Sequence, residues 1–463
     1  MNILIVGNGF DLSHYLPTKY DHFMDVMGAI ETHEGETMSF DELFSKCRED
    51  WFIAKTKEYY LTENLSLEKD QLTEIKKLLK ENSWYQYFKD HVNEVKTWID
   101  FEQKIEQVLI VSGRCIADIA NIYNSEELYK YFEDDDKNKI KIRRIDKEIL
   151  DFFVFSSDEF YESEKINTLY SEKDNYQDKI GPKRTNINAD YCNGRKIKNG
   201  FNSSLFLDFI QVQLEDFIKI FNLYLELIID ELKHRAKFEF FVQSNSLFEP
   251  EQNCWIQPDL IYSFNYTNTY QRIHNQVNIE YLHGSHGQQQ NIVLGVSDLE
   301  DESLKKIKAY GFTKYHQKLF KETDYLFLDK YKEKVKAHKR KVDYFEKDSG
   351  NTDPTAKKLE RQNIMEVESK LNINISIWGH SLDYSDRDYI IDLFSLTDEI
   401  DRNVRVTVYY FDRSAKFSLL NNLLAILGKE KVEHWMKNKW LQFKQNPEIK
   451  FQTEERAEFG EVS

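Results

Sequence analysis

The chain of 463 residues is 41% hydrophobic and 31% charged, which allows a sizeable core and excludes a wholly disordered chain. Its formal net charge of −17 argues against a nucleic-acid-binding protein, because phosphate neutralisation requires a basic surface. The 4 cysteines contain no C-x-x-C pair, which argues against a zinc ribbon and favours a reducing, cytoplasmic location. The apolar start of the chain is too short for a signal peptide, and the longest apolar region carries charged residues. We therefore expect a soluble protein without a membrane span.

Short apolar, β-branched runs predict the strands of an α/β fold. They lack polar alternation, which is typical of a parallel sheet that is covered on both faces. A further short strand is expected at Asn291–Leu294. The main runs are Asn2–Val6, Leu260–Phe264, Ile279–Leu282, Ile373–Trp378 and Val404–Phe411.

A long and mainly helical stretch separates the first predicted strand from the second. The 3.6-residue period is clearest in Trp84–Val111 and Leu205–Lys237. Within this stretch, the charged and Asn-rich segments Glu133–Arg144 and Ser171–Gly200 are expected to be mobile loops. A later segment, Asp301–Glu346, has 13 basic against 8 acidic residues and is expected to be a solvated helix pair.

These patterns predict a Rossmann-like core with two helical insertions. We expect the core to comprise residues 1–20, 256–300 and 371–463. The large insertion is 21–255, and the second, basic insertion is 301–370. Open parallel sheets bind ligands at the carboxyl ends of their strands. Each motif described next follows a predicted strand, so it is expected at that edge.

The first motif, Gly7-Asn8-Gly9-Phe10-Asp11, follows the first strand. Its two glycines allow a tight turn and the approach of backbone N–H groups to an anionic ligand. The full G-x-G-x-x-G fingerprint fails, because position 12 is leucine. A plain strand-to-helix turn is an equally good interpretation.

Asn265 and His283 follow the second and third strands. Asn265 can hydrogen-bond a carboxamide or a ribose, or it can cap the next helix. His283 can act as a general base near neutral pH, and Gly284 leaves room for a ligand beside it. A purely structural role is the alternative for each residue.

The motif after the fourth long strand is Gly379-His380-Ser381-Leu382-Asp383. It is similar in part to the G-x-S-x-G nucleophile elbow of serine hydrolases, but Asp383 replaces the second glycine. Only His434 follows it as a candidate triad histidine. We therefore favour Ser381 as a helix cap or a ribose contact.

Two further groups of residues are interpreted as structural. His283, His286 and Asp298 could together hold a cation, but solvent-exposed loop histidines are the better interpretation, and no metal is expected. In Trp98-Ile99-Asp100-Phe101-Glu102, the aromatic side chains are expected in the core and the acids on the surface.

Taken in order, the motifs resemble the AbiH family of bacteriophage abortive-infection proteins. The similar segments are N-G-F-D-L-x-x-x-L-P-T-x-Y (Asn8 to Tyr20), F-N-Y-T-x-T (Phe264 to Thr269), L-H-G (Leu282 to Gly284) and G-H-S-L-D (Gly379 to Asp383). Tyr15 stands where such sequences usually carry glycine, so we expect the turn there to be opened or rebuilt.

The same motifs are also similar to those of sirtuin-like proteins. Gly7–Asp11 is similar to their G-A-G-x-S loop, His283-Gly284-Ser285 to their H-G-S, and Gly379–Leu382 to their G-T-S-L turn. The resemblance implies that NAD is bound, without a metal. It implies catalytic roles for Asn265, His283 and Asp11. It implies NAD contacts by Gly7, Asn8, Gly9, Phe10, Pro17, Gly284, Ser285, Gly379, His380, Ser381 and Leu382.

In that picture the first glycine loop cradles the pyrophosphate and the late one holds the adenosine side. Two departures are Asp11, which replaces a serine, and Thr267, which stands where sirtuins keep an aspartate. Because the zinc-binding cysteines of deacylases are missing, hydrolysis of NAD is preferred to protein deacylation. Hydrolysis, cyclisation and ADP-ribose transfer are not separated by the sequence.

The resemblance implies an antiphage effector, an NAD glycohydrolase, that acts when a phage-encoded protein is sensed. The first alternative is a non-catalytic switch that binds a nucleotide and contacts a phage or host protein through its helical insertions. The second is a nuclease or RNA-binding effector that uses the basic segment Asp301–Glu346. Assembly into a homo-oligomer is left open.

Overall fold

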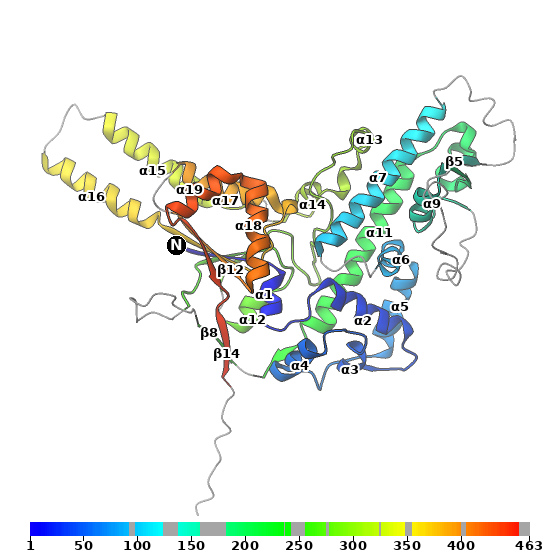
Figure 1. Ribbon diagram of the computed structural model, residues 1–463, viewed down its shortest axis with the longest axis horizontal. Helices are drawn as coiled ribbons and strands as arrows, with labels where there is room; N and C mark the ends of the chain where they lie inside the picture. Colours follow the sequence, from blue (N-terminus) through cyan, green and yellow to red (C-terminus); the bar gives the residue numbers. More distant parts are fainter. Residues whose placement is uncertain are drawn as a thin grey trace, which may run out of the picture.

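The central sheet of the computed structural model consists of parallel strands, so the predicted α/β class is confirmed (Figure 1). The structure describes residues 1–91, 98–123, 138–157, 182–235, 237–241, 255–274, 277–323, 326–347, 354–399 and 404–452. Within these residues the sheet has 6 strands in the order β10-β9-β1-β11-β12-β13. They are β1 (Asn2–Val6), β9 (Leu260–Ser263), β10 (Ile279–Tyr281), β11 (Ile373–Trp378), β12 (Val404–Tyr410) and β13 (Leu441–Gln445).

The central strands are apolar throughout because both faces of the sheet are covered. Successive side chains of a strand point to opposite faces. Ile3 and Ile5 pack with residues of α17, α18 and α19 on one face, whereas Leu4 and Val6 pack with Phe10 and neighbours of α1 and α12 on the other. Neither face of β1 therefore requires polar residues.

The sixth strand of the sheet is β13. The prediction of a strand at Asn291–Leu294 is wrong. Residues 291–294 form no strand, and the Val293 N–H donates to the carbonyl of His283 (2.8 Å). Ile292 and Leu294 are apolar because they enter the core of the helical body. The β13 sequence LQFKQ mixes polar and apolar residues, which fits a strand paired on one side only within the described sheet.

A helical body lies beside the sheet and has its own aromatic core. Figure 1 shows α2, α5, α6, α7 and α11 gathered on one side of the sheet. Phe101 lies at the centre of this core, with ring centroids 4.0 Å from Phe88 and 5.2 Å from Phe217. The predicted core position of Phe101 is therefore confirmed.

The two predicted helical segments of this body are confirmed with changed limits. Trp84–Val111 corresponds to two helices, α6 (Ser83–Asp90) and α7 (Trp98–Tyr123), with residues 92–97 outside the described part. The second segment is α11 (Ser203–Tyr224), which continues as a π-helical turn at Leu225–Ile229. Its expected end is wrong, because the chain then forms β7 (Lys233–His234) and starts β8 (Lys237–Phe241).

The remaining described elements before β9 are short. They are α1 (Asn8–Ser13), α2 (Tyr20–Thr32), β2 (Met38–Ser39), α3 (Phe40–Leu43), α4 (Asp50–Tyr59), β3 (Tyr60–Leu61), β4 (Ser66–Leu67), α5 (Lys69–Glu81), β5 (Lys139–Arg143), α9 (Arg144–Asp151) and β6 (Pro182–Asn186).

The prediction that Glu133–Arg144 and Ser171–Gly200 are loops is partly wrong. Strand β5 falls in the first and pairs with β6 in the second, in antiparallel register. Ile140 and Ile142 on β5 are buried, so alternate apolar residues in a charged segment mark a strand here. Residues 187–200 form no further strand and contain three short 3-10 turns, whereas 133–137 and 171–181 lie outside the described residues.

The elements after β10 surround the sheet and extend away from it. They are α13 (Glu302–Lys306), α14 (Lys314–Phe320), α15 (Asp329–Lys347), α16 (Pro354–Lys370), α17 (Arg387–Glu399), α18 (Arg413–Leu427), α19 (Lys429–Lys437) and β14 (Glu448–Gln452), with α12 (Thr269–Ile273) before β10.

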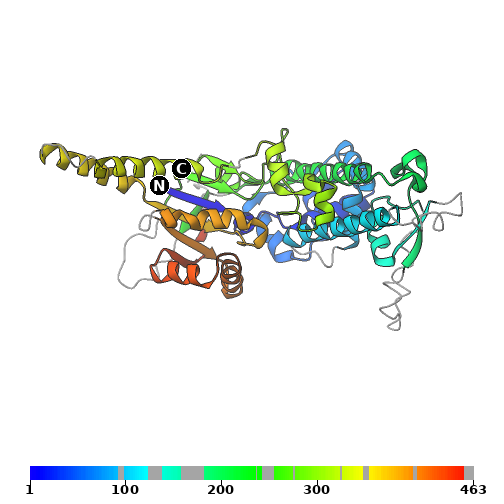
Figure 2. The same cartoon turned by 90° about the horizontal axis from the view of Figure 1, so that it is seen from above.

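Seen from above, the molecule is elongated, with α7 and α11 towards one end and α15 and α16 projecting at the other (Figure 2). The helix pair expected at Asp301–Glu346 is wrong: this segment contains α13, α14 and α15, α16 follows it, and its first part packs on the helical body through Leu304, Ala309 and Phe312. Among the described helices, none combines the length and apolar character needed to cross a lipid bilayer.

Candidate functional site

The loops that follow β1 and β11 touch through their glycines. The Gly9 N–H donates to the Gly379 carbonyl (2.8 Å). A Cβ on Gly7 would lie 2.6 Å from the His380 Cα, and one on Gly379 would lie 2.0 Å from the Phe10 nitrogen. Gly379 also has a left-handed φ of +74°. These glycines are therefore required for the contact between the two loops.

The other predicted residues of the first loop are held within the fold. Asn8 is half-buried and its side-chain oxygen accepts a hydrogen bond from the Thr18 hydroxyl (2.7 Å). Phe10 is buried beneath the loop. Pro17 is also buried, and its carbonyl accepts a hydrogen bond from the Tyr224 hydroxyl.

The turn at Tyr15 is formed without a glycine. Tyr15 adopts a left-handed φ of +57°, the conformation for which glycine is usually selected. Its ring stacks on Tyr59 (centroids 5.2 Å apart), and its carbonyl accepts a hydrogen bond from the Thr56 hydroxyl (2.8 Å). These contacts hold a tyrosine in a strained backbone position.

Asn265 joins the loop after β9 to the loop after β1. It is buried, and its side-chain amide donates to the Gly7 carbonyl (2.9 Å). The following helix α12 begins after Asn268, three residues later. The alternative that Asn265 caps this helix is therefore wrong.

Asp11 lies in a neutral polar cluster beside Asn265. Only 1% of Asp11 is exposed, and its Oδ2 accepts a hydrogen bond from the Thr267 hydroxyl (2.6 Å), which in turn accepts one from Thr269 (3.1 Å). Its Oδ1 receives no well-directed hydrogen bond within the described residues. Burial raises the pKa of Asp11 above its usual value, and the neighbouring hydroxyl and amide groups offset this only in part.

His283 belongs to a second cluster, which is centred on Asp386. The Nε2 atom of His283 lies 3.1 Å from Asp386 Oδ1, and that of His380 lies 3.3 Å from Oδ2. The Nδ1 of His380 accepts the Leu382 N–H (2.9 Å), so its Nε2 carries the proton that faces Asp386. Burial lowers the pKa of His283 to about 3, against the opposing effect of Asp386. The ring of Phe264 contacts both histidines.

A buried lysine connects this aspartate to the helical body. Lys314 Nζ lies 3.3 Å from Asp386 Oδ1 and 2.8 Å from Glu102 Oε1 on α7. Burial alone would lower the pKa of Lys314 and raise that of Asp386. The attraction of Asp386 and Glu102 reverses the shift of Lys314, and the attraction of Lys314 and His283, with hydrogen bonds from the two histidines, reverses that of Asp386.

Glu102 is not a surface acid, so that expectation is wrong. Only 15% of its side chain is exposed, and its Oε2 has no hydrogen-bond partner within the described residues. Burial raises the pKa of Glu102 to about 7, although Lys314 acts in the opposite direction.

A second lysine lies one helical turn further along α14. Lys318 is buried and donates to the Tyr389 hydroxyl (2.5 Å), with its Nζ 4.2 Å from the centre of the Tyr389 ring. Burial lowers the pKa of Lys318 to about 7. The spacing of four residues directs both lysines of this short helix towards the same cluster.

The loop that contains His283 is closely packed, so the expectation of exposed histidines is wrong. Gly284 approaches the Asn291 carbonyl, and the Ser285 N–H donates to the Asn291 side chain (2.8 Å). His286 contacts Asp230 (2.6 Å), which raises the pKa of this histidine against the effect of burial.

Ser381 lies at the surface of the late loop and is not a helix cap. Its side chain is exposed, whereas Asp383 accepts the Ser385 N–H (3.0 Å) and caps the following turn. His434, the only later histidine, is exposed on α19.

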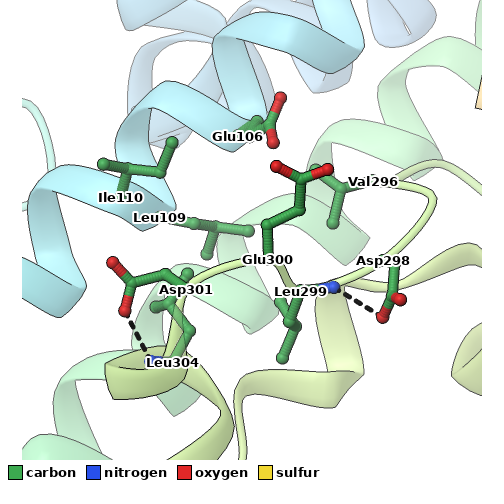
Figure 3. Close-up of a pocket in the computed structure, with 9 residues that line it drawn as sticks. All are labelled: Glu106, Leu109, Ile110, Val296, Asp298, Leu299, Glu300, Asp301 and Leu304. Carbon is green, nitrogen blue, oxygen red and sulfur yellow. Dashed lines mark hydrogen bonds between the residues drawn. The ribbon is translucent and has the colours of Figure 1, made fainter.

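A cavity of about 310 Å³ lies between α7 and the chain that follows β10 (Figure 3). Asp298 lines this cavity, whereas His283 faces Asp386, so the three residues considered for a cation do not converge. No cluster of three potential metal ligands occurs in the described parts of the chain. The lining residues are Glu106, Leu109, Ile110, Val296, Asp298, Leu299, Glu300, Asp301 and Leu304.

Sequence reasoning missed four members of the Asp386 cluster: Glu102, Lys314, Lys318 and Asp386 itself. The lysines share a helix face at a spacing of four, and Asp386 follows the G-H-S-L-D motif by three residues. Those are the signals that could have identified them. Only the fold brings these segments to one place.

The family model described as "Bacteriophage abortive infection AbiH" matches residues 3–410, and the chain therefore belongs to the AbiH family. The comparison gives no significant match to a curated protein or to a solved structure.

Proposed function

We propose that this protein is an antiphage effector that binds NAD at the carboxyl ends of its central strands and hydrolyses it during infection. The main support for this proposal is the order of the strands in the sheet. Numbered along the chain, the described strands run 3-2-1-4-5-6, the order of doubly wound dinucleotide-binding sheets. In such sheets the ligand binds where the order reverses, which is here between β1 and β11. The Gly7–Gly9 and Gly379–Ser381 loops follow those two strands.

A buried polar atom without a hydrogen-bond partner supports the presence of a ligand site at this edge. Most buried polar atoms in folded proteins are hydrogen-bonded, so an exception calls for an explanation. Asp11 Oδ1 is such an exception among the described residues, and His283 Nε2 has only Asp386 Oδ1 beside it, at 3.1 Å. A ribose offers hydroxyl groups that can donate to the carboxylate and bind the imidazole, so the chemistry of these groups fits the proposed ligand.

In the proposed reaction, the bond between nicotinamide nitrogen and ribose C1′ breaks and its electron pair leaves with nicotinamide. Water forms the new bond to C1′ and gives up one proton, so the products are nicotinamide, ADP-ribose and H⁺. Asn265 and Asp11 would hold the ribose, and His283 would accept the proton or orient the ribose hydroxyls. A transition state with oxocarbenium character needs this positioning more than a strong nucleophile.

The burial of the site suggests that it is closed in the resting protein. His283 is 6% exposed and Asp11 is 1% exposed, so a dinucleotide reaches them only if adjoining segments move. If the Gly9 N–H is to bind the pyrophosphate of NAD, it must first give up its hydrogen bond to the Gly379 carbonyl. We propose that residues 1–20, 256–300 and 371–463 form the NAD-binding core and that the helical segments restrain it until a phage protein is sensed.

The same burial favours a second candidate function, a nucleotide-binding switch without turnover. In this case the nucleotide would hold the helical segments in one arrangement, and a phage or host protein would select another. The two candidates differ in whether NAD is consumed.

The deciding experiment measures cellular NAD after phage infection in cells that carry wild-type protein or His283→Ala. His434→Ala, a change at an exposed histidine on α19, is the matched control. We expect NAD to collapse with wild type and with His434→Ala, and to stay level with His283→Ala. Protection against phage at a constant NAD level would contradict hydrolysis and support the switch.

A further inference from the structure

A continuous series of charged groups runs from the helical body to His283. Glu102 on α7 contacts Lys314 on α14 at 2.8 Å, and Lys314 contacts Asp386 at 3.3 Å. Asp386 lies 3.1 Å from His283 and 3.3 Å from His380. Apart from the contact between Asp386 and His380, the links join segments that are far apart in the sequence, so the series exists only in the folded chain.

Lys314, the middle member of this series, contacts two carboxylates at once. Lys314 is 4% exposed, and its single positive charge is shared between Glu102 and Asp386. Above pH of about 7 both carboxylates are ionised, so the three groups together carry a net charge of minus one. Asp386 favours the protonated form of His283, whereas Lys314 disfavours it. The balance between them sets how strongly His283 attracts a proton.

We propose that Glu102 and Lys314 are positioning residues that control the charge beside His283, so that the helical segments complete the site. The inference rests on the proposed function for its reaction, but its electrostatic part is independent of that reaction. Glu102 compensates part of the positive charge of Lys314. Asp386 is therefore neutralised less by the lysine and keeps more of its negative potential at the histidine. The helical body then supplies part of the active site as well as shielding it.

Single and paired substitutions separate this role from a structural one. Glu102→Gln leaves the series neutral, Lys314→Gln removes its positive charge, and the double variant leaves Asp386 as the single charge, at minus one. At pH 8 we expect Glu102→Gln to lower kcat for NAD hydrolysis about tenfold with little change in KM, because a change of one pKa unit in the base corresponds to about that factor. The double variant should be more active than Glu102→Gln, although it has lost one more polar group.

A pH profile gives a second prediction of defined sign. Lys314 lowers the pKa of His283, so Lys314→Gln should raise it and move the acid limb of the profile to higher pH. Other charged groups near this series remain unchanged in the variant. They are Lys318 on α14, His380, Asp386 and Asp388 after β11, Tyr266 after β9 and Glu102 on α7.

Histidine NMR on the full-length protein tests the inference without NAD. With ¹⁵N-labelled histidine, and His283→Ala used for assignment, we expect the His283 ring of Lys314→Gln to titrate at higher pH than in wild type. The double variant should return towards wild type. Thermal unfolding of each variant verifies the fold, and Lys314→Arg, which keeps the charge, should behave as wild type if Lys314→Gln is too unstable to use.

The outcomes distinguish the two proposals. Identical His283 titrations in all variants, or a double variant no more active than Glu102→Gln, would overturn the inference. The predicted order of titrations in a protein that consumes no NAD would retain the charge control and remove the hydrolase function.

Discussion

Asp11 and Asp386 are two buried aspartates that follow neighbouring strands of one sheet, yet their acidities shift in opposite directions. Burial alone raises the pKa of both carboxyl groups. The hydrogen-bond partner of Asp11 is the neutral Thr267 hydroxyl, and its pKa stays raised. Asp386 adjoins the Lys314 ammonium and His283, and its pKa is held well below its usual range. A cation in direct contact, rather than the extent of burial, decides the sign, because the charge of Arg272 lowers the pKa of Asp11 without reversing its shift.

The difference assigns distinct chemistry to the two clusters. A carboxyl group with a raised pKa and an unpartnered oxygen can exchange hydrogen bonds with a neutral sugar hydroxyl. A permanently ionised carboxylate next to an imidazole can instead orient that ring and stabilise its protonated form. The Asp11 cluster is therefore suited to holding a ligand, and the Asp386 cluster is suited to controlling a proton.

The largest expected effect comes from breaking the backbone contact that holds the two clusters together. In Gly379→Ala the new Cβ would lie 2.0 Å from the Phe10 backbone nitrogen, at a left-handed φ of +74°. We expect unfolding in urea to show a loss of about 3 kcal/mol or more, from strain and the forced backbone shift.

Gly428→Ala is the matched control for this substitution. Gly428 has a similar φ of +79° but no atom within 4 Å of its Cβ position. It should lose only about 1–3 kcal/mol, the cost of its backbone conformation (φ 79°, ψ 159°), which few residues other than glycine adopt. Equal losses in the two variants would contradict the close contact between the loops.

Replacing the ionised aspartate should destabilise the protein in a pH-dependent way. Asp386→Asn leaves Lys314 buried with one carboxylate instead of two, at a cost of about 3 kcal/mol at neutral pH. Because the folded-state pKa of Asp386 is depressed, its contribution is complete above its unfolded pKa of about 4 and is lost as pH falls through the folded value. Urea unfolding at pH 7 and well below pH 3.8 should show a deficit that shrinks with acidity.

Replacing Asp11 should change the stability of the protein in the opposite direction. The pKa of Asp11 is raised, so the folded protein binds this proton more tightly than the unfolded chain does. The ionised form therefore costs stability, beginning as pH rises above 3.8 and reaching its full value above the folded pKa. We expect Asp11→Asn to gain on the order of 1 kcal/mol at neutral pH while abolishing NAD loss in infected cells. A destabilised Asp11→Asn at pH 7 would remove the contrast between the clusters.

The sequence predicted one of these clusters far better than the other. Asp11 and Asn265 of the Asp11 cluster, and His283 alone of the residues that face Asp386 from another strand, each follow an apolar strand, so strand pattern placed them at one edge of a parallel sheet. The five main strands were found for the same reason. Lys314 and Glu102 come from helical segments whose docking depends on side-chain packing, which periodicity does not specify. The charged segment around Ile140 was likewise predicted as a loop, because its strand is stabilised by a partner more than forty residues away.

The sharpest test of the comparison comes from Thr267→Val. Removing the hydroxyl deletes the hydrogen bond to Asp11 Oδ2 and should raise the pKa of Asp11 further. The expected loss at neutral pH is about 1–2 kcal/mol, because an ionised acceptor is involved. Made in the Asp11→Asn background, the same change should cost clearly less, since the amide there carries no charge. A double-mutant cycle in urea at pH 7 measures this coupling, and Thr73→Val, at an exposed hydroxyl that bonds only the α5 backbone, is the control. Equal costs in both backgrounds would mean that Thr267 supports the loop rather than the carboxylate, and that Asp11 is not held by neutral donors.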